Sequence, residues 1–204
     1  MALKDIKALY NDPNYWNGQI GYRPPGYADF RVNLIKEMCI MTMRPRSVLD
    51  IGCAYGFTVN RLRSLGYDAR GVDISSYAIS QAPECAQRYL EEAPAWKMPF
   101  RNKAFDVAFS SGMLEHIPEE LMQQTVTEIC RVSERGIIGV ACADDPTSNI
   151  AEEDMDKTHG KLRTQAEWQA LFPATYSVVS DSEESWYFLA YRMVIEALSG
   201  GKYA

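Results

Sequence analysis

Two acidic residues, Asp50 and Asp73, each stand at the end of a short apolar run that is typical of a buried strand. The first run leads into a turn bounded by Gly52 and Gly56, and a helical pattern follows this turn. Glycines let a backbone approach a ligand closely, and the start of a helix offers free N–H groups. A carboxylate at the end of the next strand can accept hydrogen bonds from both hydroxyls of a ribose. The spacing therefore predicts a site for a ligand that contains a nucleoside.

The turn differs from the glycine fingerprint of dinucleotide-binding proteins. That fingerprint needs glycine or a similarly small residue at its second and third positions. Here Ala54 holds the middle position and no third glycine follows. Asp50 would repel a pyrophosphate, whereas it would attract an amino acid that carries a sulfonium charge. A nicotinamide-linked oxidoreductase remains the alternative interpretation.

Four segments of the chain carry further motifs in order. They are Asp50-x-Gly52-x-x-x-Gly56; Gly71-Val72-Asp73-Ile74-Ser75; Met98-Pro99-Phe100 with Phe105-Asp106-Val107; and Ser110-Ser111-Gly112-Met113-Leu114-Glu115-His116-Ile117-Pro118. Over roughly residues 46 to 142, these segments resemble the class I S-adenosylmethionine-dependent methyltransferases of the small-molecule type, with a methyltransferase-11-like domain. One glycine turn alone is weak evidence, but four signatures in order are strong evidence.

The resemblance implies that S-adenosyl-L-methionine is the cofactor, and it assigns residues to its parts. The residues expected around the methionine moiety are Asp50, Gly52 and Gly56, and Cys53 and Ala54 of the same turn are also expected to line the cofactor site. Cys53 is interpreted as a small packing residue of this turn and not as a nucleophile. Asp73 is expected to bind the ribose hydroxyls, Ile74 to pack on the adenine, and Ser110 to lie beneath the cofactor.

The adenine end departs from the family's pattern. Pro94 stands where such families usually carry an acid that contacts the adenine amino group. Backbone amides and Trp96 are therefore the expected adenine contacts, and a core or rim position of Trp96 is the alternative. Ser110 stands where metal-binding members usually carry an aspartate, so no metal is expected.

The two histidines of the chain, His116 and His159, are the candidate catalytic bases. Methyl transfer to a hydroxyl benefits from a base, and the pKa of histidine suits this role. His116 follows the predicted fourth strand and His159 lies in a loop after the fifth, at the side of an open α/β sheet where ligands bind. Support of a local turn by His116 and a solvated loop position for His159 are the alternatives.

Alternating helical and strand patterns predict the elements that position these residues. The expected strands are 47–51, 68–73, a short one near Tyr89, 105–109, 135–142, 176–180 and 186–192, and the expected helices are 28–43, 57–65, one from Ser75, 118–132 and 165–172. This order predicts a doubly wound, Rossmann-like α/β sheet that is mostly parallel, with helices on both faces. The last two strands are expected to form an antiparallel C-terminal hairpin.

A length of 204 residues favours one domain. We expect an N-terminal helical segment or lid at 1–45, a cofactor-binding core at 46–142, and an acceptor-side loop, helix and strands at 143–204. Five aromatic residues and one arginine of this segment are expected either to close over the cofactor and the acceptor or to pack an N-terminal helix: Tyr10, Tyr15, Trp16, Tyr22, Tyr27 and Arg23.

The amino-acid composition indicates which binding partners and which cellular compartment to expect. The net charge is −6 and the basic residues are scattered, so nucleic acid is not an expected partner. Five cysteines without a CxxC pair indicate reduced thiols, and no apolar run is long enough to cross a membrane, so a cytoplasmic protein is expected. The predicted function is methyl transfer to a small-molecule acceptor, namely a hydroxyl of a sugar or natural product. A non-catalytic nucleoside-binding module is a further alternative, and the oligomeric state stays open.

Overall fold

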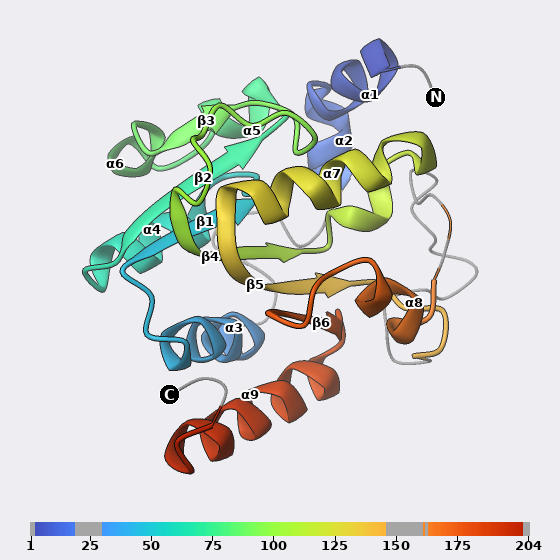
Figure 1. Ribbon diagram of the computed structural model, residues 1–204. Helices are drawn as coiled ribbons and strands as arrows, with labels where there is room; N and C mark the ends of the chain where they lie inside the picture. Colours follow the sequence, from blue (N-terminus) through green and yellow to red (C-terminus); the bar gives the residue numbers. More distant parts are fainter. Residues whose placement is uncertain (1–2, 19–29, 146–160, 162, 202–204) are drawn as a thin grey trace.

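The computed structural model describes residues 3–18, 30–145, 161 and 163–201, and these form a six-stranded sheet between two layers of helices (Figure 1). The strands are β1 (Ser47–Ile51), β2 (Asp68–Asp73), β3 (Leu90–Glu92), β4 (Phe105–Ser111), β5 (Ser133–Val140) and β6 (Tyr176–Ser180). Their order is β3-β2-β1-β4-β5-β6, and every neighbouring pair is parallel. The chain reverses its direction of winding between β1 and β4, where ligands of such sheets bind. The predicted Rossmann-like α/β fold is confirmed.

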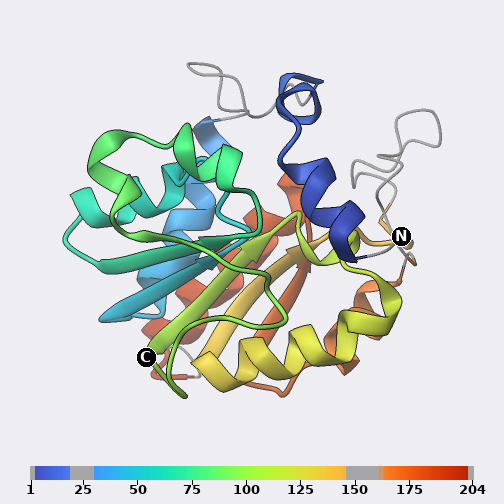
Figure 2. The same cartoon turned by 90° about the horizontal axis from the view of Figure 1, so that it is seen from above.

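The described helices include the five whose ranges the sequence predicted. They are α1 (Leu3–Tyr10), α2 (Pro13–Gly18), α3 (Phe30–Thr42), α4 (Phe57–Ser64), α5 (Ser76–Ser80), α6 (Glu84–Gln87), α7 (Glu119–Val132), α8 (Gln165–Ala170) and α9 (Glu183–Leu198), with a 3-10 turn η2 at Leu114–His116. Helices α3 and α9 cover one face of the sheet and α7 covers the other (Figures 1 and 2). Ser75 caps α5 as expected, because its side chain accepts the N–H of Ala78.

The core explains why the strands are apolar on both faces. In β1, Val48 packs with α3, α4 and α9, whereas the next residue, Leu49, packs with α7 and α8. In β5, Ile137 likewise faces α3, α4 and α9, and Ile138 faces α7 and α8. Side chains alternate between the two faces of a strand, so a sheet covered on both faces requires a continuous apolar run.

The predicted antiparallel C-terminal hairpin is wrong. β6 pairs in parallel with β5, and the segment expected as a second strand, 186–192, lies within α9. Its aromatic residues favour a strand, but Trp186, Leu189, Ala190 and Met193 are all buried, at the spacing of one helix face. Ser182 caps the helix by accepting the N–H of Ser185 at 3.4 Å. The helix therefore covers the face of the sheet, and the chain does not turn back along its edge.

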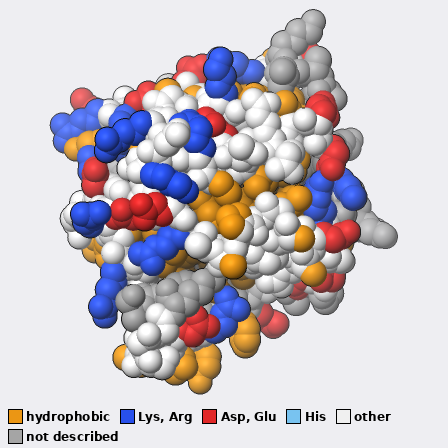
Figure 3. Space-filling model, viewed as in Figure 1, with side chains coloured by type: hydrophobic (Ala, Val, Ile, Leu, Met, Phe, Trp, Pro, Cys, Tyr) orange, Lys and Arg blue, Asp and Glu red, His pale blue; other side chains and the backbone are white. Residues whose placement is uncertain are grey.

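Charged side chains of both signs are interspersed on the face seen in Figure 3. Several basic residues of the described chain are paired with acids, for example Arg63 with Asp68 at 2.5 Å and Lys7 with Glu92 at 2.5 Å. Exposed pairs of this kind contribute little to stability. In the described part of the chain, no helix is both long and apolar enough to cross a membrane.

Candidate cofactor and acceptor site

The turn after β1 is fastened to β2 by its backbone. The N–H groups of Gly52 and Cys53 both donate to the carbonyl of Val72, at 2.9 and 3.1 Å. Gly52 and Gly56 have φ of 76° and 65°, in the left-handed region that favours glycine, and Ala54 is held there as well with φ 46°. The turn therefore presents backbone at the carboxyl ends of β1 and β2.

Asp73 holds this turn through its carboxylate. One oxygen accepts the N–H of Ala54 at 2.9 Å and the other accepts the N–H of Ser75 at 2.8 Å. Burial raises the pKa of Asp73, and the amides of Ser75, Ala54 and Ile74 oppose this increase. Each carboxylate oxygen has a second lone pair, so Asp73 can also accept hydrogen bonds from a diol.

Asp50 lies on the neighbouring strand, where it is only 5% exposed. Burial, and then the charge of Asp73, raise the pKa of Asp50 to about 7, while the Lys36 ammonium acts in the opposite direction. Two buried carboxyl groups side by side are stabilised by a positively charged ligand. The residues therefore fit S-adenosylmethionine, which combines a ribose diol with an ammonium and a sulfonium charge.

The glycines of the turn also make room for side chains. A Cβ on Gly52 would lie 2.6 Å from Cγ of Met113, and a Cβ on Gly56 would lie 2.7 Å from Cδ1 of Leu90. Cys53 packs into the core, and burial raises the pKa of its thiol well above the usual range. The thiol therefore stays protonated, in agreement with a packing residue.

The remaining expected cofactor contacts lie on separate elements. Ile74 is half-buried between Asp73 and the start of α5. Ser110 is fully buried near the end of β4, and its hydroxyl has no hydrogen-bond partner among the residues that the structure describes. Trp96 is half-buried against the core beneath α7, and its carbonyl accepts a hydrogen bond from Gln124 at 3.1 Å.

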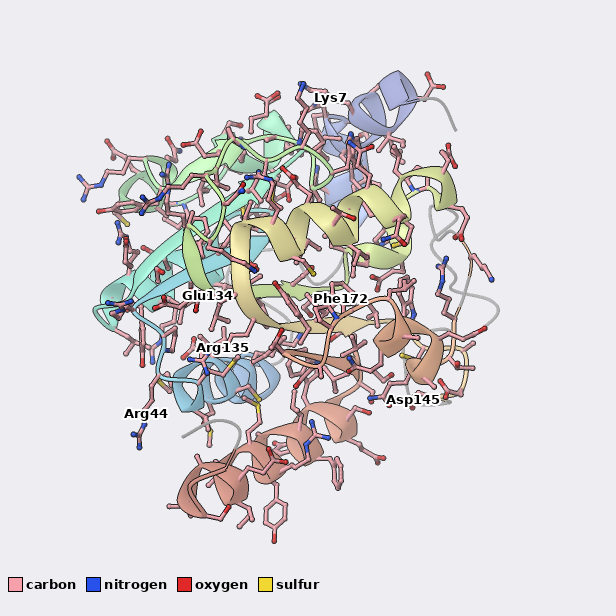
Figure 4. The ribbon with its side chains drawn as sticks, in the orientation of Figure 1. Lys7, Arg44, Glu134, Arg135, Asp145 and Phe172 are labelled. Atoms are coloured by element: carbon pink, nitrogen blue, oxygen red, sulfur yellow. The ribbon has the colours of Figure 1, made fainter. Side chains whose placement is uncertain are left out.

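The N-terminal helices pack beside the glycine turn. Trp16 and Tyr55 have ring centroids 5.4 Å apart, and the Trp16 indole N–H donates to the carbonyl of Tyr10 at 2.8 Å. Lys7 of α1 pairs with Glu92 of β3 at 2.5 Å, and Figure 4 shows Lys7 on this helix. The aromatic residues of α1 and α2 therefore contact the turn that presents Ala54 and Tyr55.

Of the two candidate bases, the structure describes His116. It lies half-buried in η2, and its ring centroid is 6.2 Å from that of Tyr10 in an edge-to-face arrangement. His116 is thus near the N-terminal helix at the carboxyl end of β4. His159 lies outside the described residues.

An ionic cluster at the ends of β4 and β6 has no counterpart in the sequence-based predictions. Lys36 of α3 donates to the hydroxyl of Ser111 at 2.7 Å and pairs with Asp181 at 3.1 Å. The indole N–H of Trp186 donates to Asp181 at 2.7 Å. Burial raises the pKa of Asp181, but Lys36 and these hydrogen bonds outweigh it and keep the pKa below the usual range.

Glu115 is a second residue that the sequence analysis did not single out. It is 5% exposed, one oxygen accepts the N–H of Ala141 at 3.1 Å, and the other has no hydrogen-bond partner among the described residues. Burial, supported by the charge of Asp181, raises the pKa of Glu115 to about 7. The sequence signal that could have identified Glu115 is its position between Leu114 and His116, shortly after a buried strand.

Within the described ranges, no group of three or more His, Cys, Asp and Glu side chains is arranged to hold a metal ion.

The parallel sheet, the glycine turn and the two acids define a class I, Rossmann-like methyltransferase domain. Residues 49–139 match the family described as "Methyltransferase domain", so this segment is a methyltransferase domain of the S-adenosylmethionine-dependent class. The cofactor of this family is S-adenosylmethionine, as predicted.

Two curated relatives match part of the chain. The chain is 34% identical over 84 residues to the tRNA U34 carboxymethyltransferase of Pseudomonas savastanoi pv. phaseolicola, covering 37% of this chain and 26% of the relative. It is 35% identical over 92 residues to the ubiquinone biosynthesis O-methyltransferase of Paraburkholderia phymatum, covering 42% of this chain and 38% of the relative. The chain thus spans well under half the length of these two relatives.

A solved structure supports the fold over a longer stretch. The SAM-dependent methyltransferase from Archaeoglobus fulgidus superimposes with a TM-score of 0.54 at 21% identity, covering 69% of this chain and 66% of that chain. At this identity the similarity concerns the fold.

Proposed function

We propose that this protein transfers a methyl group from S-adenosylmethionine to a hydroxyl of a small-molecule acceptor, such as a sugar or natural product. The observation that carries the proposal is the pair of buried carboxyl groups, Asp50 and Asp73, at the ends of adjoining strands beside a glycine turn. When bound, the cofactor supplies a methyl carbon that its positively charged sulfur makes electrophilic.

Asp73 would bind the ribose hydroxyls with the lone pairs that Ala54 and Ser75 leave free, and Asp50 would pair with the ammonium of the methionine moiety. Hydrogen bonds to a charged acceptor contribute about 1.5–3 kcal/mol each. Ile74, Trp96 and Ser110 are proposed to surround the adenine and the underside of the cofactor. Their proposed roles rest on the family's motifs.

The acceptor would bind at the ends of β4 to β6, between residues 1–45 and residues 143–204. Most of the acceleration of an in-line methyl transfer can come from holding the acceptor in attack geometry. The ion pair of Lys36 with Asp181 would place charged side chains beside the acceptor.

Three residues are candidates to accept the proton of the acceptor hydroxyl. His116 and His159 are proposed from their positions in the sequence, and Glu115 is added because one of its buried oxygens lacks a hydrogen-bond partner in the described part of the chain. A pKa of about 7 also suits a general base at neutral pH. Replacing each residue in turn distinguishes the three candidates, because only loss of the base should lower turnover.

A small-molecule acceptor is supported by the charge of the protein. The net charge is −6, and several surface arginines are paired with acids, which leaves little positive surface for a phosphate backbone. The two curated relatives act on a tRNA and in ubiquinone biosynthesis, as their names state. Each relative matches less than half of this chain, so neither identifies the acceptor of this protein.

Calorimetric titration with S-adenosylhomocysteine tests the cofactor site, with NADH as the competing ligand. We expect binding of the former only, and preferential binding of NADH would favour an oxidoreductase. A screen with methyl-labelled cofactor then tests hydroxylated small molecules beside bulk tRNA. Labelling of tRNA alone would refute the proposed acceptor class. With an acceptor identified, His116→Ala, His159→Ala and Glu115→Gln show which residue lowers turnover while cofactor binding is retained.

A further inference from the structure

The outward face of α9 carries a stripe of exposed apolar side chains. Seven large hydrophobic residues are exposed in the described part of the chain, and five of them lie on this helix. The five are Tyr187, Phe188, Tyr191, Ile195 and Leu198, with exposed fractions from 46% to 80%. Apart from the adjacent pair Tyr187 and Phe188, they are spaced three to four residues apart, which places them on one side of the helix. We refer to them as the α9 stripe.

The opposite side of α9 is buried in the core of the protein. Trp186, Leu189 and Met193 are at most 3% exposed and pack against α3 and the sheet. A surface helix of a monomer needs only one apolar face, so the α9 stripe is a second one. Figure 3 shows hydrophobic side chains along the lower edge of the molecule, and Figure 4 shows side chains of α9 projecting there, away from α3.

We propose that the α9 stripe is the contact surface for a second copy of this chain, related to the first by a two-fold axis. This inference is independent of the proposed methyl transfer. Fully burying an aromatic side chain removes about 150–250 Å² from water, so the partly exposed stripe offers on the order of 500 Å² of surface. Two facing stripes then bury on the order of 1,000 Å², which reaches the lower range of specific interfaces.

The chemistry of the stripe fits a copy of itself. In an antiparallel pair of α9 helices, the aromatic first half of one stripe lies against the aliphatic second half of the other. Arg192 and Glu196 flank the stripe, 3.7 Å apart on the same helix. A two-fold contact is self-complementary, so Arg192 of each copy can meet Glu196 of the other.

A membrane surface fits the α9 stripe less well. Helices that lie on membranes are usually rich in Lys and Arg on their polar side. Helix α9 has one basic residue, Arg192, beside three acids, Glu183, Glu184 and Glu196. The chain as a whole carries a net charge of −6, which disfavours an anionic lipid surface.

Sedimentation velocity over a wide range of protein concentration tests the proposal with the full-length chain. We expect the wild type to form a dimer, and Phe188→Glu and Tyr191→Glu each to raise the dimer dissociation constant by about tenfold or more, since large apolar anchors dominate interfaces. Both side chains are exposed, so the variants should keep the wild-type circular dichroism and S-adenosylhomocysteine binding. Leu65→Glu is the matched control, because Leu65 is 41% exposed just after α4, and it should stay dimeric.

Three results would overturn the proposal. The first is a wild type that remains monomeric at every concentration. The second is a dimer that both glutamate variants retain, because the contact must then lie elsewhere. The third is a monomer that sediments with vesicles of phosphatidylcholine and phosphatidylglycerol but loses this binding in Phe188→Glu, because the stripe is then a lipid-binding surface.

Discussion

Lys36 and Asp181 form an ion pair of 3.1 Å that joins α3 to the residue directly after β6. Ser111 at the end of β4 lies between them, since it accepts a hydrogen bond from Lys36 and donates one to Asp181 at 3.1 Å. Both charged residues lie outside residues 49–139, the segment that matches the methyltransferase domain. The carboxyl ends of β4 and β6 are therefore held together by residues that lie outside the matched segment.

Replacing Lys36 with Met should lower the free energy of unfolding by about 2 kcal/mol or more, because it leaves the charge of Asp181 without its partner. The side chains of the pair are 17% and 25% exposed, so part of the charge stays solvated. Urea denaturation measures the change. The double variant Lys36→Met/Asp181→Asn should recover part of the loss.

The exposed ion pair of Lys7 with Glu92 provides the control, since its side chains are 53% and 41% exposed. Lys7→Met should change stability by about 0.5 kcal/mol or less. Equal effects of the two lysine substitutions would contradict a special role for the Lys36 pair.

Asp73→Ala should weaken binding of S-adenosylhomocysteine by about tenfold or more, because it removes the acceptor proposed for the ribose hydroxyls. It also removes the hydrogen bond that holds the N–H of Ala54, so thermal unfolding should be measured in parallel. Asp68→Ala is the matched control at the exposed start of β2. Calorimetric titration measures both, and wild-type affinity in a folded Asp73→Ala protein would refute the assignment.

Gly52→Ala should destabilise the protein more than Gly66→Ala. Both glycines have a positive φ, 76° and 90°, which costs about 1–2 kcal/mol for an L-residue. Only at Gly52 would the added Cβ also meet a neighbour, since it would lie 2.6 Å from Cγ of Met113, whereas nothing lies within 4 Å at Gly66. Thermal denaturation compares them, and equal losses would show that Met113 moves aside without cost.

Glu115 should make the protein less stable as the pH rises from about 4.5 to about 7. Its carboxyl group keeps a proton up to about pH 7 in the folded state but releases it near 4.5 when unfolded. The folded state thus binds more protons in this window, and raising the pH favours unfolding. In Glu115→Gln the fall in the free energy of unfolding should be shallower, and Asp50 should account for part of what remains.

The exposed Glu120 of α7 serves as the control for this measurement. Glu120→Gln should leave the pH dependence of urea denaturation unchanged. A Glu115→Gln protein with the wild-type pH dependence would mean that Glu115 is ionised in the folded state throughout this range.

The sequence was sufficient to predict the elements that depend on neighbouring residues. The apolar run before Asp50, the left-handed turn at Gly52 and the cap at Ser75 each depend on neighbouring residues. They predicted the strand, turn and helix that the structure contains. The segment 186–192 was misassigned because its aromatic residues suit a strand as well as a buried helix face.

Tertiary packing makes the segment 186–192 a helix. Trp186 lies over Gly139 of β5, where an added Cβ would come within 2.5 Å of the indole ring, so the glycine makes the space that the helix fills. The two residues are far apart in the sequence, and no local pattern relates them.

The same distinction applies to the site. The sequence by itself was sufficient to predict the part of the site proposed to bind the cofactor, because Asp50, Gly52 and Asp73 lie within one strand–turn–helix–strand unit. Only the tertiary structure brought Lys36, Glu115 and Asp181 together from three distant segments. Whether a charge is buried, and which opposite charge compensates it, depends on the packing of whole elements and not on neighbouring residues.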